Sequence, residues 1–260
     1  LNFSTQKTMR IAQQLYEGVD VRGHGTIGLI TYLRTDSTRI SDEAAAAAGS
    51  YIAETYGSEY SEARQAAGRS GPVRSQDAHE AIRSTDILRT PDSLKADLSR
   101  DQFRLYQLIW RRFAASRMSA ARYETTQVRI VGKGDGGSHL FTVSGSRVLF
   151  EGFMAVYTND EEEGMNAGGA GGITENSTLT LREFLPEQHF TQPQPHYTEA
   201  SLVRALEEQG IGRPSTYAPT ITTILARRYV VKEEKNLYMT ELGEVVNTMM
   251  KEAFPQIVDP

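Results

Sequence analysis

The hydrophobic pattern of this chain changes character twice, and this change limits the possible folds more than any other feature. Apolar residues recur at helical spacing up to about residue 117, and a pattern typical of β-strands follows from Tyr123 to Leu185. Helical spacing returns from Thr198. This order predicts a multidomain α+β chain, in which 260 residues can form two to three small domains. The expected domains are 1–118, 119–195 and 196–260.

Composition excludes several classes of protein. The chain has no cysteine, which rules out disulfides and zinc sites of the cysteine type. With 39% hydrophobic and 23% charged residues, it has the composition of an ordinary soluble globular protein. No segment is long enough to span a bilayer and the first residues do not form a signal sequence, so we expect a cytoplasmic protein that does not bind a membrane.

The net charge of -5 argues weakly against DNA binding by the chain as a whole. Its distribution matters more. The acidic run Asp160–Glu163 begins a glycine-rich stretch that reaches Gly172, and we expect a mobile loop there that cannot preorganise a metal site. Two other segments are locally basic and either face phosphates or form solvated faces. Their basic residues are Arg104, Arg111, Arg112, Arg117 and Arg122, and Arg213, Arg227 and Arg228.

The N-terminal segment predicts an amphipathic helix from Ser4 to about Glu17, ended by Gly18. Gln13 and Glu17 are one turn apart on this helix and therefore share a face. On spacing alone they can form part of a solvated polar stripe, and a family resemblance described below gives the alternative. The other elements expected here are a loop over 19–26 and a helix capped by Ser41 that ends near Gly57.

The clearest helix runs from Leu98 to Arg117, and Ser99 and Gln102 form a capping box at its start. Trp110 is expected to pack in the core rather than to stack on a base. The expected core face consists of Leu105, Leu108, Ile109 and Phe113. The β segment that follows predicts strands over 125–131, 140–143, 147–150 and 178–184.

The last segment predicts a helix-turn-helix-like module with a wing. Thr198 caps a helix from Glu199 to Gln209, and Gly210 ends it. Pro219 must lie in the first turn of a second helix because it cannot donate a helix hydrogen bond. A two-stranded wing over 229–239 and a helix from residue 241 complete the expected module.

The segment Gly28–Ser37 contains the strongest candidate for chemistry. Leu29 to Thr31 favour an extended strand, in which Tyr32 and Arg34 would point to the same face. A phenol is a poor nucleophile at neutral pH because it ionises near pH ~10, but a neighbouring guanidinium favours the phenolate and can bind a phosphate. This pair is suited to attack on a phosphodiester. The alternative is a strand tyrosine that merely packs.

The segment Ser75–Thr85 contains a second set of candidates. His79 and Arg83 are four residues apart and would share one helical face, a spacing suited to adjacent phosphates. The alternative is that His79 is an exposed or internally satisfied side chain. Glu80 faces another side of the expected helix and is interpreted as structural.

Three segments together resemble the bacterial type IA DNA topoisomerases. Leu-Ile-Thr-Tyr-Leu-Arg-Thr-Asp-Ser at 29–37 is similar to the active-site segment of that family. His-Glu-Ala-Ile-Arg-Ser-Thr at 79–85 and Ile-Gly-Arg-Pro-Ser-Thr-Tyr-Ala at 211–218 resemble two further segments, in the family's order. Leu33 stands where methionine is common, and Ser84 stands where proline is usual. The resemblance extends over essentially the whole chain.

This resemblance implies a transesterification on DNA. Tyr32 would attack a phosphodiester of single-stranded DNA and carry the 5′-phosphate until the strand is resealed, and Arg34 would stabilise the transition state. Negatively supercoiled DNA would be relaxed without ATP, because the ester conserves the bond energy. The residues implied to contact the DNA strand or to border the cleavage site are His79, Arg83, Arg213, Ser215, Thr216, Gln13 and Glu17.

The resemblance also implies parts that this sequence lacks. In the family a Toprim domain with an acidic cluster binds Mg²⁺, and no comparable cluster occurs here, so we expect an internal fragment that is inactive alone. Residues 1–118 would carry the active tyrosine, 119–195 would belong to a β-rich arch and 196–260 to a helical DNA-binding base. Its partners would be DNA and the Toprim domain, in the bacterial cytoplasm at the nucleoid.

Two other functions compete with this interpretation. In a non-catalytic module that binds single-stranded DNA, the last helices and the wing would hold DNA while Tyr32 packs. A tyrosine recombinase would need a set of Arg and His residues spaced along a catalytic domain, and this sequence does not contain one.

Overall fold

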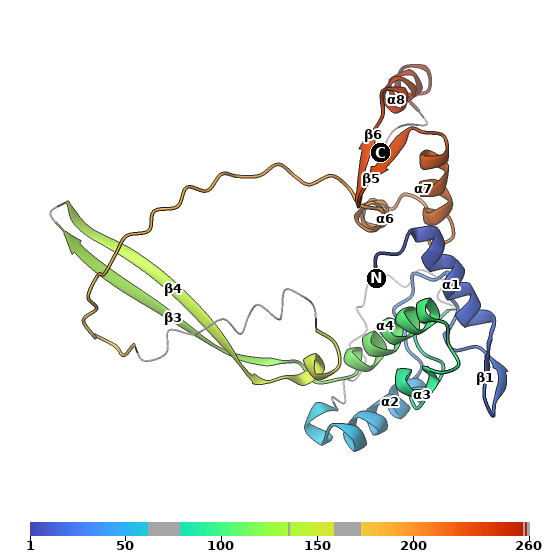
Figure 1. Ribbon diagram of the computed structural model, residues 1–260, viewed down its shortest axis with the longest axis horizontal. Helices are drawn as coiled ribbons and strands as arrows, with labels where there is room; N and C mark the ends of the chain where they lie inside the picture. The colour runs from blue at the N-terminus through green and yellow to red at the C-terminus, as the bar shows by residue number, and fades with distance from the viewer. Residues whose placement is uncertain (62–78, 135, 159–172, 257, 259–260) are drawn as a thin grey trace. The chain divides into compact units, whose positions relative to one another are not determined.

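The computed structural model describes residues 1–61, 79–134, 136–158, 173–256 and 258. The chain divides into two compact units, each assembled from segments far apart in the sequence (Figure 1). Both units combine helices with small two-stranded antiparallel sheets, so the predicted mixture of α and β elements is confirmed. The first unit contains Leu1–Ser41, Pro72–Trp110 and Thr191–Pro260, and the second contains Asp42–Gly71 and Arg111–Phe190.

The first helix of the first unit, α1, spans Thr5–Glu17, as the sequence predicts. The Ser4 hydroxyl caps it by accepting the Lys7 N–H, and Gly18 ends it at a φ of 134°, which favours glycine. The loop predicted over 19–26 is wrong. This stretch is a short antiparallel hairpin of β1 (Val19–Val21) and β2 (Gly25–Ile27), too brief to produce a strand pattern in the sequence.

The second part of the first unit is α3 (Pro91–Leu94) and the greater part of α4 (Arg100–Ser116). The predicted capping box is confirmed, since Ser99 and Gln102 exchange hydrogen bonds between side chain and backbone. Trp110 is buried and donates its Nε1–H to the Ile87 carbonyl at 2.9 Å, so it packs as predicted. Leu108 was expected in the core but is 39% exposed. Buried apolar residues here include Ile11, Leu15, Leu29, Ile30, Leu33, Ile87, Leu94, Leu98, Leu105 and Tyr106.

The C-terminal part of the first unit contains the helices and the two-stranded wing that the sequence predicts. Thr198 and Ser201 form a capping box at the start of the first of its helices, and Pro219 lies in the first turn of the next. The second helix of this module, α7, contacts α1, α6 and β5 (Figure 1). The elements of the module are α6 (Glu199–Glu208), α7 (Tyr217–Ala226), β5 (Val230–Glu233), β6 (Asn236–Met239) and α8 (Glu241–Ala253).

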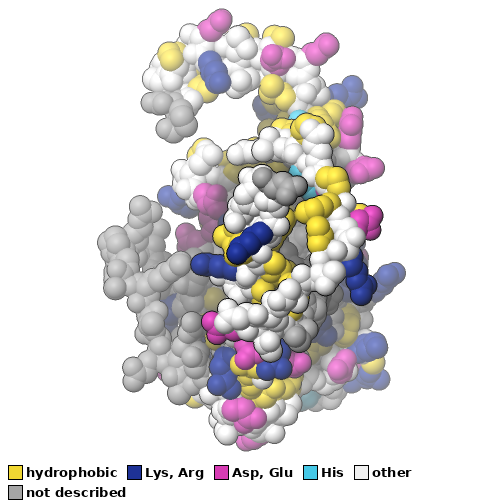
Figure 2. Space-filling model, turned by 90° about the vertical axis from the view of Figure 1, so that its left-hand side faces the viewer, with side chains coloured by type: hydrophobic (Ala, Val, Ile, Leu, Met, Phe, Trp, Pro, Cys, Tyr) yellow, Lys and Arg dark blue, Asp and Glu magenta, His cyan; other side chains and the backbone are white. Residues whose placement is uncertain are grey.

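The second unit is dominated by one long hairpin. Its strands β3 (Arg122–Gly134) and β4 (Gly137–Phe150) unite the runs predicted at 125–131, 140–143 and 147–150. The strand predicted over 178–184 is wrong, because no strand of the described residues pairs with it. Some hydrophobic side chains of the chain are exposed at its surface, as the yellow side chains in Figure 2 show. The remaining elements of the unit are α2 (Asp42–Thr55), η1 (Ser58–Tyr60), η2 (Gly152–Ala155) and the end of α4.

Two predicted features fall outside the described residues. The acidic loop Asp160–Gly172 does so entirely, and the segment Ser75–Thr85 does so up to residue 78. In the part of the chain that the structure describes, no helix combines the length and the apolar character needed to cross a membrane.

Candidate active site

The segment Gly28–Ser37 is held by backbone hydrogen bonds on both sides. The Leu29 N–H donates to the Leu15 carbonyl in α1 at 2.7 Å. On the other side the Thr31 N–H donates to the Arg83 carbonyl at 3.0 Å, and the Thr85 N–H donates to the Leu29 carbonyl at 3.0 Å. The predicted strand over 29–31 is therefore reduced to one antiparallel bridge, between Ile30 and Ser84.

Side chains strengthen this connection between residues 28–31 and 79–85. The Thr31 hydroxyl donates to the Ala81 carbonyl at 2.7 Å and accepts the Arg83 N–H at 2.9 Å. The Thr85 hydroxyl donates to the Gly28 carbonyl at 2.9 Å. Residues 79–85 lie beside the Tyr32 segment because of these bonds, and they are not helical, so the predicted helical face shared by His79 and Arg83 is wrong.

Tyr32 lies between two other rings. The His79 ring stacks on it with centroids 4.8 Å apart, and the Tyr16 ring of α1 meets it edge-on at 5.5 Å. Tyr32 itself is half-buried, whereas Ile30 and Leu33 on either side of it are buried. The structure thus brings two predicted site residues, Tyr32 and His79, into contact. The sequence does not indicate Tyr16 as a site residue, because nothing in its helical spacing reveals a ring contact made through tertiary structure.

Arg34 lines a groove of about 380 Å³ between α1 and α7. Arg34 is exposed, and its guanidinium takes part in none of the ion pairs found among the described residues. The structure brings Arg34 together with Ser215, a second predicted site residue. A guanidinium, an amide and hydroxyls are donors suited to a phosphate–sugar backbone. Further lining residues, which the sequence analysis missed, include Gln6, Met9, Thr222 and Thr223.

Arg83 is engaged within its own segment. Its Nε and Nη2 donate to one Glu80 carboxylate oxygen at 2.8 and 2.5 Å, and Nη1 donates to the Ser84 carbonyl at 2.9 Å. Burial alone would raise the pKa of Glu80, but hydrogen bonding and the charge of Arg83, with help from Ser41 and Arg39, outweigh burial and lower it. The pair holds the turn that carries His79, and the structural interpretation of Glu80 agrees with this contact.

The remaining predicted residues lie at two further places. The Thr216 hydroxyl closes the turn before α7, since it accepts a hydrogen bond from the Arg213 N–H at 2.9 Å and donates one to the Arg213 carbonyl at 3.1 Å. The Arg213 side chain is exposed and donates from Nη1 to the Gly212 carbonyl at 2.7 Å. On α1, the Gln13 amide donates to the Glu17 carboxylate at 2.6 Å.

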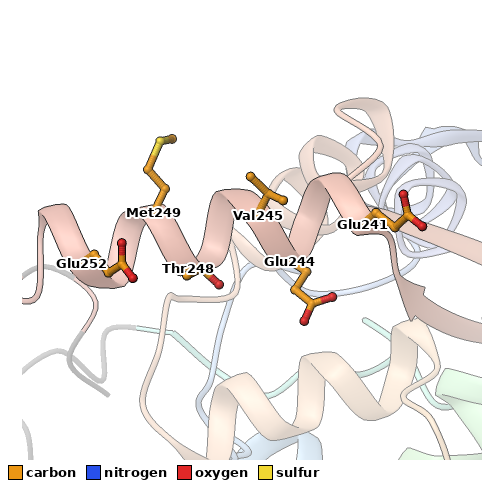
Figure 3. Close-up of a pocket in the computed structure, with 6 residues that line it drawn as sticks. All are labelled: Glu241, Glu244, Val245, Thr248, Met249 and Glu252. Carbon is orange, nitrogen blue, oxygen red and sulfur yellow. The ribbon is translucent and has the colours of Figure 1, made fainter.

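No metal centre can be built from the described residues, because no three His, Asp or Glu side chains among them converge on one point. A second hollow, of about 480 Å³, runs along α8 (Figure 3). Its charged lining residues are all glutamates, which do not match an anionic strand. These are Glu241, Glu244 and Glu252, beside Val245, Thr248 and Met249.

The comparisons with known proteins agree on one family. The family model described as DNA topoisomerase matches residues 1–260. The chain is also similar to the solved structure of full-length topoisomerase I from Thermotoga maritima in a monoclinic crystal form, with 38% sequence identity and a TM-score of 0.76. This similarity covers 100% of the present chain and 41% of that chain, so the present chain spans less than half of that relative.

Proposed function

The chain belongs to the bacterial type IA DNA topoisomerase family, and from this premise we propose that Tyr32 is the nucleophile that cleaves and rejoins one DNA strand. The observation that supports this proposal is the setting of Tyr32. Its ring is fixed between His79 and Tyr16, and Arg34, two residues further on, lines a groove with polar donors. Because these contacts already restrict the orientation of the phenol, less conformational entropy is lost when it reaches the reactive geometry.

The proposed chemistry is a transesterification that leaves the number of phosphate esters unchanged. The Tyr32 oxygen bonds to phosphorus as the bond from phosphorus to the 3′-oxygen breaks, which gives a 5′-phosphotyrosine and a 3′-hydroxyl. Tyr32 loses one proton and the 3′-oxygen gains one. Reversal of the step reseals the strand, so relaxation of negative supercoils needs no ATP.

The groove between α1 and α7 is the proposed path of the single strand towards Tyr32. Arg34 would bind a phosphate with two donors and stabilise the charge that develops in the transition state, and Ser215 would donate to the backbone further along. Arg213 is exposed near the start of α7 and would add a phosphate contact. For Arg83 and Thr216 we propose indirect roles, because their polar groups already bond within the protein. Gln13 and Glu17 would border the site on α1.

The complete reaction is proposed for an enzyme larger than this chain. The relative of known structure is more than twice as long as this chain. We propose that a Toprim domain elsewhere in the complete enzyme would hold Mg²⁺. The described residues offer no set of ligands for that ion. The hairpin β3–β4 would belong to the arch and α6–α8 to the base. The enzyme would act on supercoiled and single-stranded DNA at the nucleoid.

The decisive experiment is Tyr32→Phe in the full-length enzyme. This change removes one hydroxyl and keeps the ring between His79 and Tyr16, so folding and non-covalent DNA binding should persist. Relaxation of supercoiled DNA and the covalent protein–DNA adduct should both disappear. Arg34→Lys should retain part of the activity that Arg34→Ala loses, because an ammonium keeps the charge without the bidentate geometry.

Tyr197→Phe is the matched control. It removes the same hydroxyl from a tyrosine that is 51% exposed and does not line the groove, so relaxation should be unchanged. Wild-type relaxation by Tyr32→Phe would refute the proposal and favour a module that only binds DNA.

A second prediction concerns the isolated chain. Without a metal site in the described residues, it should neither cleave nor relax supercoiled DNA, whether or not Mg²⁺ is added. Gel assays of the purified chain, with the full-length enzyme as the positive control, measure this. Metal-dependent relaxation by the chain alone would show that the Mg²⁺ ligands do not lie in the Toprim domain, contrary to our proposal.

A further inference from the structure

A single carboxylate connects three segments of the first unit that are distant in sequence. Glu199, the first residue of α6, is 8% exposed. Its Oε2 accepts two hydrogen bonds from Thr5, the first residue of α1, from the N–H at 2.7 Å and from the hydroxyl at 2.8 Å. Its Oε1 accepts a third from the Lys232 ammonium of β5 at 2.7 Å. The carboxylate therefore links α1 to the C-terminal module.

The environment of Glu199 favours the charged form that makes these bonds. Burial alone would raise the pKa of Glu199, but the hydrogen bonds from Lys232 and Thr5 outweigh it and lower the pKa. The carboxylate also lies at the N-termini of two helices, α1 and α6, where the unpaired N–H groups favour negative charge.

The position of α1 matters to the site at both ends of the helix. Near its start, Gln6 and Met9 line the groove that Arg34 and Ser215 share. Near its end, Tyr16 contacts the Tyr32 ring. The opposite wall of the groove is α7, which belongs to the module that contains Glu199. A change at Glu199 would therefore alter the groove without touching any residue that lines it.

Resting on the proposed function, we propose that Glu199 is a positioning residue that sets the separation of α1 and α7, and thereby the width of the groove that receives the DNA strand. Glu199 does not line the groove. It acts through α1, because its bonds to Thr5 fix the start of that helix relative to the helices of the C-terminal module.

The test measures the distance between the two helices directly. The natural chain has no cysteine, so Arg10→Cys and Thr220→Cys, both at exposed positions on α1 and α7, introduce unique sites for spin labels. The distribution of distances between the two spin labels on the 260-residue chain is recorded by pulsed electron paramagnetic resonance. Glu199→Ala removes all three bonds, Glu199→Gln keeps the shape with one acceptor oxygen, and Thr5→Val removes only the hydroxyl.

Asp97→Asn is the matched control. Asp97 has a side chain that is 8% exposed, against 9% for Glu199, and pairs with Arg22 at 2.5 Å in the same unit; neither Asp97 nor Arg22 lines the groove. The Glu199 variants should broaden the distance distribution, and Thr5→Val should broaden it less. Asp97→Asn should leave it unchanged. If circular dichroism shows that Glu199→Ala does not fold, Glu199→Gln and Thr5→Val decide the outcome.

The second readout is the dissociation constant of the same proteins for a single-stranded oligonucleotide, measured by fluorescence anisotropy. Glu199→Gln should weaken binding several-fold while Asp97→Asn does not. Unchanged distances in folded Glu199→Gln, equal broadening in Asp97→Asn, or broadening without loss of affinity would each overturn the inference and leave the proposed function standing. Failure of the wild-type chain to bind any oligonucleotide would overturn the role of the groove in the proposed function as well.

Discussion

Gly28 offers the sharpest test of how the Tyr32 segment is positioned. A Cβ atom added at this residue would lie 2.7 Å from the Tyr16 carbonyl oxygen of α1. The clash is with backbone, so no flexible side chain can turn away to relieve it. The Gly28→Ala variant should therefore push the end of α1 away from the Tyr32 segment.

The magnitude follows from the contacts at this point. The gap must open by about 0.5 Å or more before a methyl group fits, and overpacking of this kind costs about 1–3 kcal/mol. The shift also strains the 2.7 Å bond from the Leu29 N–H to the Leu15 carbonyl. Because Tyr16 and Tyr32 are in ring contact, the same shift should lower cleavage by roughly tenfold, given that misplacement by about 1 Å costs on the order of 100-fold.

The assay compares thermal unfolding of the chain with single-turnover cleavage by the full-length enzyme. Gly134→Ala is the control, because a Cβ there meets nothing within 4 Å, and its free energy of unfolding should change by less than about 0.5 kcal/mol. Wild-type unfolding and cleavage in Gly28→Ala would refute the close approach of Gly28 to α1.

Two further predictions concern stability. Ser84→Ala should raise the free energy of unfolding by about 1 kcal/mol in a denaturant titration, because the Ser84 hydroxyl is buried and lacks a hydrogen-bond partner among the described residues; a loss of stability would contradict this. Glu199→Gln should be less stable than wild type at neutral pH. The pKa of Glu199 lies below its ordinary value of 4.5, so its contribution is complete above that pH and is lost as the pH falls through the lower value; a difference from wild type that persists in strong acid would contradict this.

The sequence predicts best those elements whose signals are local. Thr198 and Ser99 mark helix starts by their own hydroxyl groups, and both caps form. Pro219 limits the start of α7 through its missing N–H. Each of these signals depends on bonds within about one helical turn, so tertiary structure does not need to be known.

Predictions that depended on a distant partner were less successful. Residues 178–184 have the composition of a strand, but no strand of the described residues pairs with them. Leu29 to Thr31 pair only through the single bridge at Ile30. His79 reaches Tyr32 through backbone bonds between segments about 50 residues apart, and no helical face is involved. The family resemblance, and not the helical spacing, assigned Tyr32 and His79 to one site, and their rings are in contact.

The distribution of ion pairs explains how a chain with a net charge of -5 can present a local site for phosphates. Some of its cations are paired with carboxylates that have structural roles, as Arg83 is with Glu80 and Lys232 with Glu199. Arg34 has no such partner among the described ion pairs and lines a groove whose other polar groups are uncharged. A single uncompensated guanidinium in a neutral groove attracts one phosphate strongly and the rest of a strand weakly. That arrangement favours placing one phosphodiester beside Tyr32 over holding DNA tightly along its length.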